Sequence, residues 1–454
     1  MAGGAAEERQ TRWVPLLEPI LEHGRQEMAS LPIPDELLVD IFLRLPTPID
    51  LVRASAACIS FRRVAVDRSF IRRYRKLHGP PLLGFLDRQK VFYPAMAPHP
   101  LASAANAVAL AADFSFSFLP APASDWVVQD VRDGRVLLDR TPQYATDSTR
   151  HLFVFPELVV CDPLHRRYLL LPPIPHDLAA SVDDPLWTDR FRYCEIFLAP
   201  PGGDDEEASA AEETSFSVIW MAQCTTELVA SVFWSSTGQW RAISSMSCSD
   251  LFSGLLPLTG SHHFSWRQYS YGCFYWVTDW RERLLVLDTQ TMEFSIAEPP
   301  PEARGLPCVD IAIVEAGEGM PGMFVLSEDA VYLDYTIRRS NCGSSSQWQH
   351  EKTFSLDSKC SVMGAVGRHL LLYQLGNPSL GAGCFLLDVK TLQLERLLVS
   401  NSSRPYGHIY SNFPPSMLST PAISSGVEKK GAGEETPEQG CAAASSREQS
   451  PCLE

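Results

Sequence analysis

The sequence predicts a multi-domain protein, in which a small all-α unit is followed by a larger all-β body. Two observations support this division. Apolar residues recur at helical spacing over 31–67, whereas the chain beyond about residue 110 carries short apolar runs that end in polar turns. The 454 residues are enough for about two or three domains, and the 45% of hydrophobic residues can form a large core.

The helical unit begins with prolines at positions 32 and 34, which hold the chain extended. Asp35 and Glu36 follow, where the first turn of a helix favours negative charge. One apolar stripe then continues at helical spacing through Leu37, Leu38, Ile41, Phe42 and Leu45. A second helix is predicted from Pro48, and a short third helix over 61–66.

Several residues of this unit stand in a characteristic order, namely Leu31, Pro32, Asp35, Glu36, Leu37, Leu38, Ile41, Leu45, Leu51 and Cys58. In this order the unit resembles an F-box. Phe61 stands where many members of that family have tryptophan. The continuation over 60–64, 69–74 and 80–85 looks like the plant members of the family, especially those of grasses.

The resemblance implies docking onto the Skp-type adaptor of a cullin–RING ubiquitin ligase. The residues that it assigns to this docking are Leu31, Pro32, Leu37, Leu38, Ile41, Leu45 and Leu51. The apolar pattern agrees, because a helical unit of fewer than about 50 residues cannot bury so many apolar side chains by itself. We therefore expect part of the stripe to be exposed for a partner and the rest to turn inward.

The all-β body shows a degenerate repeat, in which an apolar run ends at an aspartate and a polar turn. The copies are 158–163, 284–291, 331–336 and 384–391, together with 232–237, where Ser235 replaces the aspartate. The carboxylate can accept backbone N–H groups two residues on and so define a hairpin turn. Asp288, Asp334 and Asp388 are spaced by 46 and 54 positions, which suits propeller blades of roughly 40 to 50 residues.

A second part of the repeat is a glycine followed by an apolar strand, at Gly134, Gly272 and Gly367. Near-continuous apolar strands are typical of strands covered on both faces by neighbours. With further strands near 126–131 and 404–410 for closure, the repeat predicts a β-propeller of about six blades, and a β-sandwich is the alternative. The body resembles the propeller-like F-box-associated regions of plant F-box proteins.

These features predict the domain boundaries. They are a flexible lead-in over 1–30, the F-box over 31–78, a linker over 79–109, the propeller-like body over 110–412 and a disordered tail over 413–454. The tail has no aromatic residue after Pro421, which favours disorder. An acidic loop near 204–213 interrupts the body.

Composition narrows the functional classes. The net charge of −16 and the pI near 5.2 argue against nucleic acid as the main partner. We interpret a basic cluster after the helices as a solvated helix surface, formed by Arg62, Arg63, Arg68, Arg72, Arg73, Arg75, Lys76 and His78. The 12 cysteines include no CxxC pair, which predicts reduced thiols in the cytoplasm or nucleus. The sequence shows no secretory signal and no membrane-spanning stretch.

The residue patterns predict no catalysis, no cofactor and no metal. Residues 317–322 match the letters of a dinucleotide-binding loop, but an apolar strand follows where that loop needs a helix, so a hairpin is predicted. His262 and His263 are adjacent and would point to opposite faces of a strand, which disfavours a shared metal ion. The acidic loop lacks the alternating ligands of a calcium site.

The sequence therefore predicts a non-enzymatic substrate-recognition subunit of an SCF-type E3 ubiquitin ligase, whose β-body binds an unknown target protein. Two alternatives stay open, a propeller enzyme with an unrelated helical leader and an F-box scaffold that does not promote ubiquitination. Aromatic residues that could contact a target or fill the blade core are Trp266, Tyr269, Tyr271, Trp276 and Trp280. Neither nucleic acid nor a membrane is expected as a partner.

Overall fold

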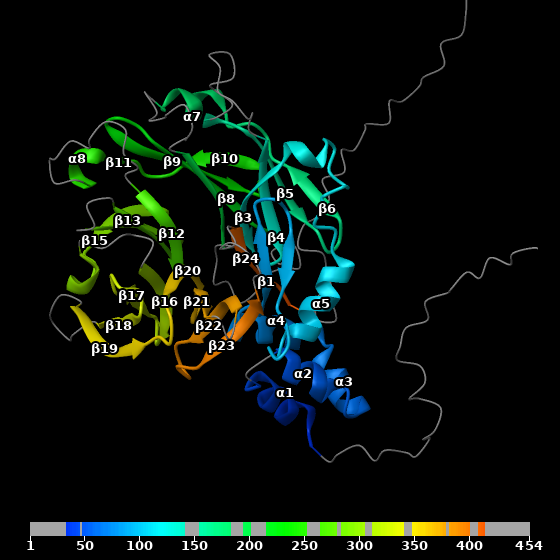
Figure 1. Ribbon diagram of the computed structural model, residues 1–454. Helices are drawn as coiled ribbons and strands as arrows, with labels where there is room; N and C mark the ends of the chain where they lie inside the picture. The colour runs from blue at the N-terminus through cyan, green and yellow to red at the C-terminus, as the bar shows by residue number, and fades with distance from the viewer. Residues whose placement is uncertain are drawn as a thin grey trace, which may run out of the picture.

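The computed structural model describes residues 33–45, 48–140, 154–182, 194–200, 215–251, 264–278, 283–304, 311–339, 347–377, 381–399 and 407–413. It confirms the predicted division into a short helical region and an all-β body (Figure 1). The predicted lead-in over 1–30, the acidic loop near 204–213 and the tail beyond 413 lie outside the described residues.

Four helices form the N-terminal unit, which we call the F-box region: α1 (Asp35–Leu43), α2 (Pro48–Ser55), α3 (Ile59–Ala65) and α4 (Arg68–Leu77). Local chemistry explains two of the starts. The Asp67 carboxylate accepts the backbone N–H of Phe70 at 2.9 Å, which caps α4. The Cys58 thiol accepts the N–H of Phe61 at 3.5 Å and caps α3. The helices share a small core of Leu38, Phe42, Leu51, Val64, Ala65, Phe70, Ile71 and Tyr74.

The described strands of the body form six antiparallel sheets arranged as a six-bladed propeller (Figure 1). Blade 2 contains β3 (Val127–Arg132), β4 (Arg135–Arg140), β5 (Glu157–Asp162) and β6 (Arg167–Leu170). Blade 3 contains β7 (Cys194–Ala199), β8 (Ser217–Gln223), β9 (Glu227–Trp234) and β10 (Gln239–Ala242), with β11 (Met246–Ser247) also paired to β9. Blade 4 contains β12 (Phe264–Ser270), β13 (Cys273–Thr278), β14 (Leu284–Asp288) and β15 (Glu293–Ala297).

Blade 5 contains β16 (Ile311–Gly317), β17 (Met320–Leu326), β18 (Tyr332–Arg339) and β19 (Gln347–Ser355). Blade 6 contains β20 (Cys360–Val366), β21 (His369–Asn377), β22 (Gly381–Asp388) and β23 (Leu394–Val399). The connections carry α7 (His176–Ala180), α8 (Cys248–Leu251) and two 3-10 turns, Ala123–Asp125 and Pro301–Ala303. Within 317–322, residues 318–319 form a tight turn between the antiparallel strands β16 and β17, which confirms the predicted hairpin.

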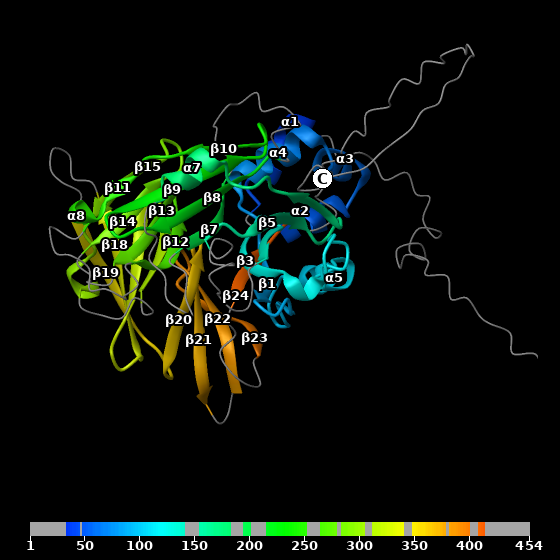
Figure 2. The same ribbon diagram turned by 90° about the horizontal axis from the view of Figure 1, so that it is seen from above.

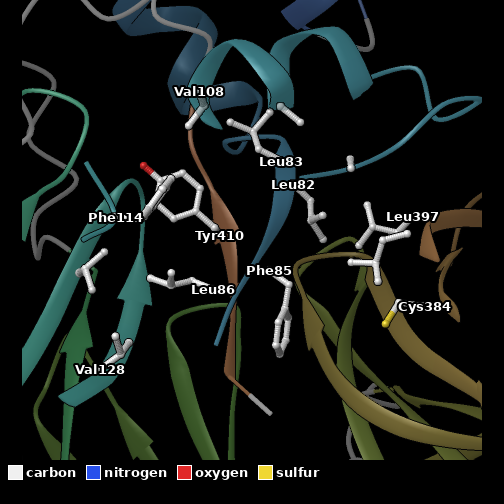
Figure 3. Close-up of a cluster of buried hydrophobic side chains, with 14 of the residues drawn as sticks. Leu82, Leu83, Phe85, Leu86, Val108, Phe114, Val128, Cys384, Leu397 and Tyr410 are labelled. Atoms are coloured by element: carbon white, nitrogen blue, oxygen red, sulfur yellow. The ribbon is translucent and has the colours of Figure 1, made fainter. Parts of the chain in front are cut away.

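Blade 1 closes the ring by pairing the two ends of the body. Its strand order is β2 (Phe92–Pro94), β1 (Leu82–Asp87), β24 (Gly407–Ser411), so the last described strand lies beside the first. β24 contacts β3, the first strand of blade 2. Figure 3 shows Phe85 on the side of Cys384 and Leu397 of blade 6, and Leu86 on the side of Val128 of blade 2. The ring is therefore closed by apolar packing on both sides of β1.

The linker predicted over 79–109 differs from the structure. This stretch contains β1, β2 and α5 (Ala102–Ala111), and Ala105 and Val108 of α5 are buried against the blade 1 core. The near-continuous apolar run 82–86 is buried throughout, as expected for a strand covered on both faces. The sequence repeat does not include β1, because blade 1 takes its third strand, β24, from the other end of the body.

The predicted aspartate turns are confirmed at three positions, and the prediction is wrong at a fourth. Asp288 accepts the N–H groups of residues 290 and 291 at 2.7 and 3.1 Å. Asp388 accepts those of 390 and 391 at 2.7 and 3.3 Å, and Asp162 those of 164 and 165 at 3.0 and 3.1 Å. Asp334 instead lies within β18, opposite Thr353 of β19, so it is no turn residue. Ser235 follows β9 as expected, but its hydroxyl accepts the N–H of Phe216.

Candidate functional site

The helix α1 carries apolar residues on two faces. Leu38 and Phe42 are 2% and 3% exposed and point into the core of the F-box region. Leu37 and Ile41 are 55% and 50% exposed. Each pair is spaced by one helical turn, so each pair lies on one face of the helix. The inward pair holds α1 on its neighbours, and the outward pair gives it an apolar surface without an internal partner in the described chain.

The inward face is packed through aromatic contacts. The ring of Phe42 meets that of Phe61 on α3 edge-on, with centroids 5.2 Å apart and an interplanar angle of 87°. Phe70 on α4 lies 6.3 Å from Phe42, also edge-on. Edge-to-face pairs of this kind stabilise a core beyond simple burial of area. Phe61 therefore supplies an aromatic contact at the position where the resemblance leads us to expect tryptophan.

The structure separates the predicted docking residues into groups. Leu37 and Ile41 are exposed, whereas Leu38 and Leu51 are buried at 2% and 1% and act through the core. Leu45 is partly buried, and its carbonyl accepts the Tyr74 hydroxyl at 3.2 Å. Leu31 and Pro32 lie outside the described residues. The side chains available to a partner are thus fewer than the set that the sequence predicted.

A charged pair borders this surface. The Arg63 guanidinium on α3 donates to both carboxylate oxygens of Asp35 on α1, at 2.8 and 2.6 Å. The two side chains are 67% and 47% exposed, so the pair contributes at most about 1 kcal/mol and mainly aligns the two helices. Within the predicted basic cluster Arg62 and Arg73 are also exposed, while the side chains of residues 68, 72 and 76 are not described.

One residue of the F-box core comes from the far end of the chain. Phe413 falls within the predicted disordered tail, and that prediction is wrong for this residue, because Phe413 is 7% exposed and packs in the cluster that contains Leu38 and Phe42. Nothing in the F-box pattern indicates a residue so distant along the chain. The available signal was that Phe413 follows the closing strand and precedes a stretch with no further aromatic residue.

The aromatic residues proposed as target anchors are mostly structural where they are described. Trp276 is fully buried, and its indole N–H donates to the Glu195 carboxylate at 2.8 Å. Tyr269 packs under the Arg132 guanidinium at 4.3 Å. Tyr271 is 36% exposed, and its hydroxyl accepts the Gly317 N–H at 2.8 Å. The Trp266 side chain and Trp280 lie outside the described part.

Charged side chains from four blades meet at the inner strands. Arg267 contacts Asp130 at 3.1 Å and Glu195 at 3.5 Å, and His408 faces Asp130 at 3.7 Å. The side chains of Arg267 and Asp130 are only 15% and 10% exposed. Burial lowers the pKa of His408 to about 4, opposed by Asp130 and assisted by the nearby charges of Arg267 and Arg88. This cluster joins blades across the ring.

The described residues contain no group of histidine, cysteine or acidic side chains arranged to hold a metal ion. The adjacent histidines at 262 and 263 lie outside those residues. No helix among the described residues has the length and apolar character needed to cross a membrane. The seven cysteines whose side chains are described are free thiols, and burial raises the pKa of Cys161 and Cys360, the latter to about 11.

Comparison with known proteins identifies the helical region. Residues 32–76 match the protein family described as F-box-like. The protein thus combines an F-box-like domain with a six-bladed propeller body. F-box domains in general bind Skp-type adaptors. No curated protein matches the chain.

Solved structures similar to the body are distant. The β-propeller domain of the Trilobed protease from Pyrococcus furiosus has 11% identity and a TM-score of 0.31, covering 63% of this chain and 72% of that one. A protein from Lactobacillus plantarum has 11% identity and a TM-score of 0.34, with 63% and 84% covered. The acylaminoacyl peptidase of Pyrococcus horikoshii has 10% identity and a TM-score of 0.30, with 63% and 40% covered. Similarities this distant assign no activity to the chain.

Proposed function

We propose that this protein is the substrate-recognition subunit of an SCF-type E3 ubiquitin ligase. The observation that carries the proposal is the exposed pair Leu37 and Ile41, at 55% and 50%, inside the region that matches the F-box-like family. Two large apolar side chains one turn apart, on a helix already anchored by its other face, suit a protein partner. The partner would be a Skp-type adaptor, and through it a cullin–RING ligase.

The propeller would hold a target protein within reach of the ubiquitin-charged subunit. This role needs no catalytic group in the chain, because binding both partners raises the effective concentration of the target lysine. The protein would act in the cytoplasm or nucleus, without nucleic acid, membrane or cofactor. The resemblance of 60–64, 69–74 and 80–85 to grass sequences is the reason to propose a plant-type receptor.

The proposal is tested by binding of purified Skp-type adaptor to the full-length protein. The variant Leu37→Asp/Ile41→Asp would place two charges in the interface, and we expect adaptor binding to fall at least about 100-fold because buried unpaired charges are costly. Leu110→Asp is the matched control, since Leu110 is 89% exposed on α5. Equal binding by the double variant and the control would disprove the docking assignment.

A second arm addresses ubiquitination. The full-length protein, adaptor, cullin–RING subunits and cell extract are combined, and ubiquitin-modified peptides are compared between wild type and Leu37→Asp/Ile41→Asp. We expect a set of modified proteins to depend on the intact pair. If adaptor binds but no modification depends on it, the protein is a scaffold and the receptor proposal fails.

A further inference from the structure

The chain leaves the closing strand β24 and enters the core of the F-box region. Phe413 is 7% exposed and belongs to the same buried cluster as Leu38 of α1 and Phe70 of α4. The Arg75 guanidinium of α4 lies over its ring, 5.2 Å from the centroid. One side chain from the far end of the body therefore completes a core that is otherwise made by residues 33–74.

The two residues before Phe413 are held by hydrogen bonds to the propeller. We call residues 411–413 the closure segment. The Asn412 N–H donates to the Pro81 carbonyl at 3.1 Å, in the short connection from α4 to β1. The Ser411 carbonyl accepts the N–H of Gly134 at 2.9 Å, in the β3–β4 hairpin of blade 2. Asn412 is 4% exposed. Three successive residues thus contact blade 2, the exit of the F-box region and its core.

We propose that Phe413 is a positioning residue for adaptor docking, and that the closure segment makes the order of the F-box region depend on closure of the propeller. The inference rests on the proposed function, because it concerns the same adaptor surface. A unit of about 45 residues has too small a core to lose a large aromatic side chain without loosening. The helix α1, which presents Leu37 and Ile41, packs directly on that core.

The closure segment also restricts the orientation of the F-box region. The chain connects this region to the body covalently through residues 78–81, and Phe413 adds a second attachment next to the first. A region joined by one short peptide could swivel, whereas two attachments restrict that motion. Figures 1 and 2 show α1–α4 outside the ring, beside the blade that contains β1. An adaptor bound to α1 would therefore be held in one orientation relative to the target-binding body.

A glycine in blade 2 allows the coupling to be tested without altering the F-box region. Gly134 has φ +77°, and a Cβ at this position would overlap the side-chain amide of Asn412. Gly272 occupies the same hairpin position in blade 4, with φ +78°, and its nearest neighbour would be the Thr289 hydroxyl oxygen at 3.8 Å. Alanine introduces the same backbone strain at both positions, and only at Gly134 does it push on the closure segment.

The experiment measures adaptor affinity and amide hydrogen exchange of residues 33–77 in the full-length protein. For Gly134→Ala we expect affinity to fall about tenfold and exchange in α1–α4 to rise by a similar factor, while Gly272→Ala stays within about twofold of wild type. Gly134→Ala/Asn412→Ala should recover most of both losses, since it removes the overlapping side chain. Phe413→Ala should reproduce the losses, and Phe413→Leu should be milder because it keeps most of the apolar volume.

The readouts separate this inference from the proposed function. If wild type binds no adaptor, the proposed function fails, and hydrogen exchange still decides whether the closure segment orders the helices. If wild type binds and Gly134→Ala matches Gly272→Ala in both measurements, the coupling is disproved. The same holds if Phe413→Ala leaves exchange in α1–α4 unchanged. A loss that Asn412→Ala fails to rescue would show general strain in blade 2, which also overturns the inference.

Discussion

Arg267 of blade 4 forms an ion pair with Asp130 of blade 2 across the inner strands, with Nη2 and Oδ2 3.1 Å apart. The same carboxylate oxygen, Oδ2, also accepts the backbone N–H of Leu198 in blade 3 at 2.9 Å. Arg267 in turn lies over the Phe197 ring at 4.2 Å and reaches Glu195 at 3.5 Å. Blades 2, 3 and 4 are thereby connected through one guanidinium.

Removal of that guanidinium should destabilise the body strongly. Arg267→Leu would leave the Asp130 and Glu195 carboxylates poorly compensated in a region that is largely buried, so we expect a loss of about 2 to 4 kcal/mol in the free energy of unfolding. Arg304→Leu removes an ion pair whose side chains are 49% and 82% exposed, and should change stability by less than about 0.5 kcal/mol. Urea denaturation of both variants checks this, and equal effects would contradict a role for the central cluster.

The buried histidine of the closing strand should make stability depend on pH. The pKa of His408 is lowered to about 4, so the unfolded chain binds this proton at a higher pH than the folded protein. Acidification from about pH 6.5 to 4 therefore favours unfolding, and the stability held above 6.5 is lost across that window. His408→Asn should flatten the pH dependence by about 1 to 3 kcal/mol over this range.

Two other histidines contribute to the pH dependence of stability. Burial also lowers the pKa of His99 and His369. The stability of both wild type and His408→Asn therefore still decreases in acid. These two histidines are present in both proteins, and the difference between wild type and His408→Asn isolates His408. His350→Asn, on the exposed strand β19, is the control substitution. Parallel stability curves for wild type and His408→Asn would show that the histidine does not contribute.

The predictable part of this fold was local. Helix starts, second strands of blades and turn aspartates each depend on a few neighbouring residues, so spacing alone located α1, the strand after Gly272 and the turn at Asp288. The turn predicted at Asp334 is wrong, because an aspartate inside a strand follows apolar residues in the same way as an aspartate at the end of a strand. The partner of Asp334, the Thr353 hydroxyl, comes from the next strand and is invisible in the local sequence.

The unpredictable part depends on pairing between distant segments. β1 closes the ring by pairing with β24 from the other end of the body, and a strand count that begins at residue 110 cannot include it. The docking surface shows the same limit. The stripe on α1 identified Leu37, Leu38 and Ile41 together, and only the packing of α3 and α4 shows that Leu38 turns inward. Phe413 in the F-box core is a third case of distant pairing.

Fragments of the body should test the closure directly. Residues 110–412, the boundaries expected from sequence, lack β1 and β2 and would leave β24 unpaired and the core around Phe85 open. We expect this fragment to be aggregated or to lack a cooperative melt, whereas 79–413 should melt cooperatively. Calorimetry of both fragments checks this. A cooperative transition of equal enthalpy for 110–412 would show that blade 1 is dispensable.

The turn aspartates provide the sharpest test of the repeat, because two equivalent positions differ in their surroundings. Asp288 accepts two backbone N–H groups. Asp388 accepts two as well and also forms an ion pair with Arg368 at 3.1 Å. Asp288→Ala should therefore cost about 1 kcal/mol and Asp388→Ala about 1 to 2 kcal/mol. Asparagine keeps a neutral acceptor, so Asp288→Asn should be close to wild type, and Asp388→Asn intermediate because the ion pair is lost.

Asp334 supplies the matched control for this series, because it sits within β18 and none of its described contacts is to a backbone N–H group of a turn. Its alanine and asparagine variants should both lose or weaken the contact to Thr353. Asparagine should not restore stability at this position, because no turn N–H group needs its side-chain oxygen as an acceptor. Thermal melts of all six variants in the full-length protein make the comparison. Adaptor binding should be retained in each, because the substituted residues belong to blades 4, 5 and 6, whereas the closure segment is held by Gly134 of blade 2 and by Pro81. If alanine at 288 and 388 leaves the melting temperature unchanged, the carboxylates do not hold the hairpins, and the equivalence of the two turns would rest on strand order alone.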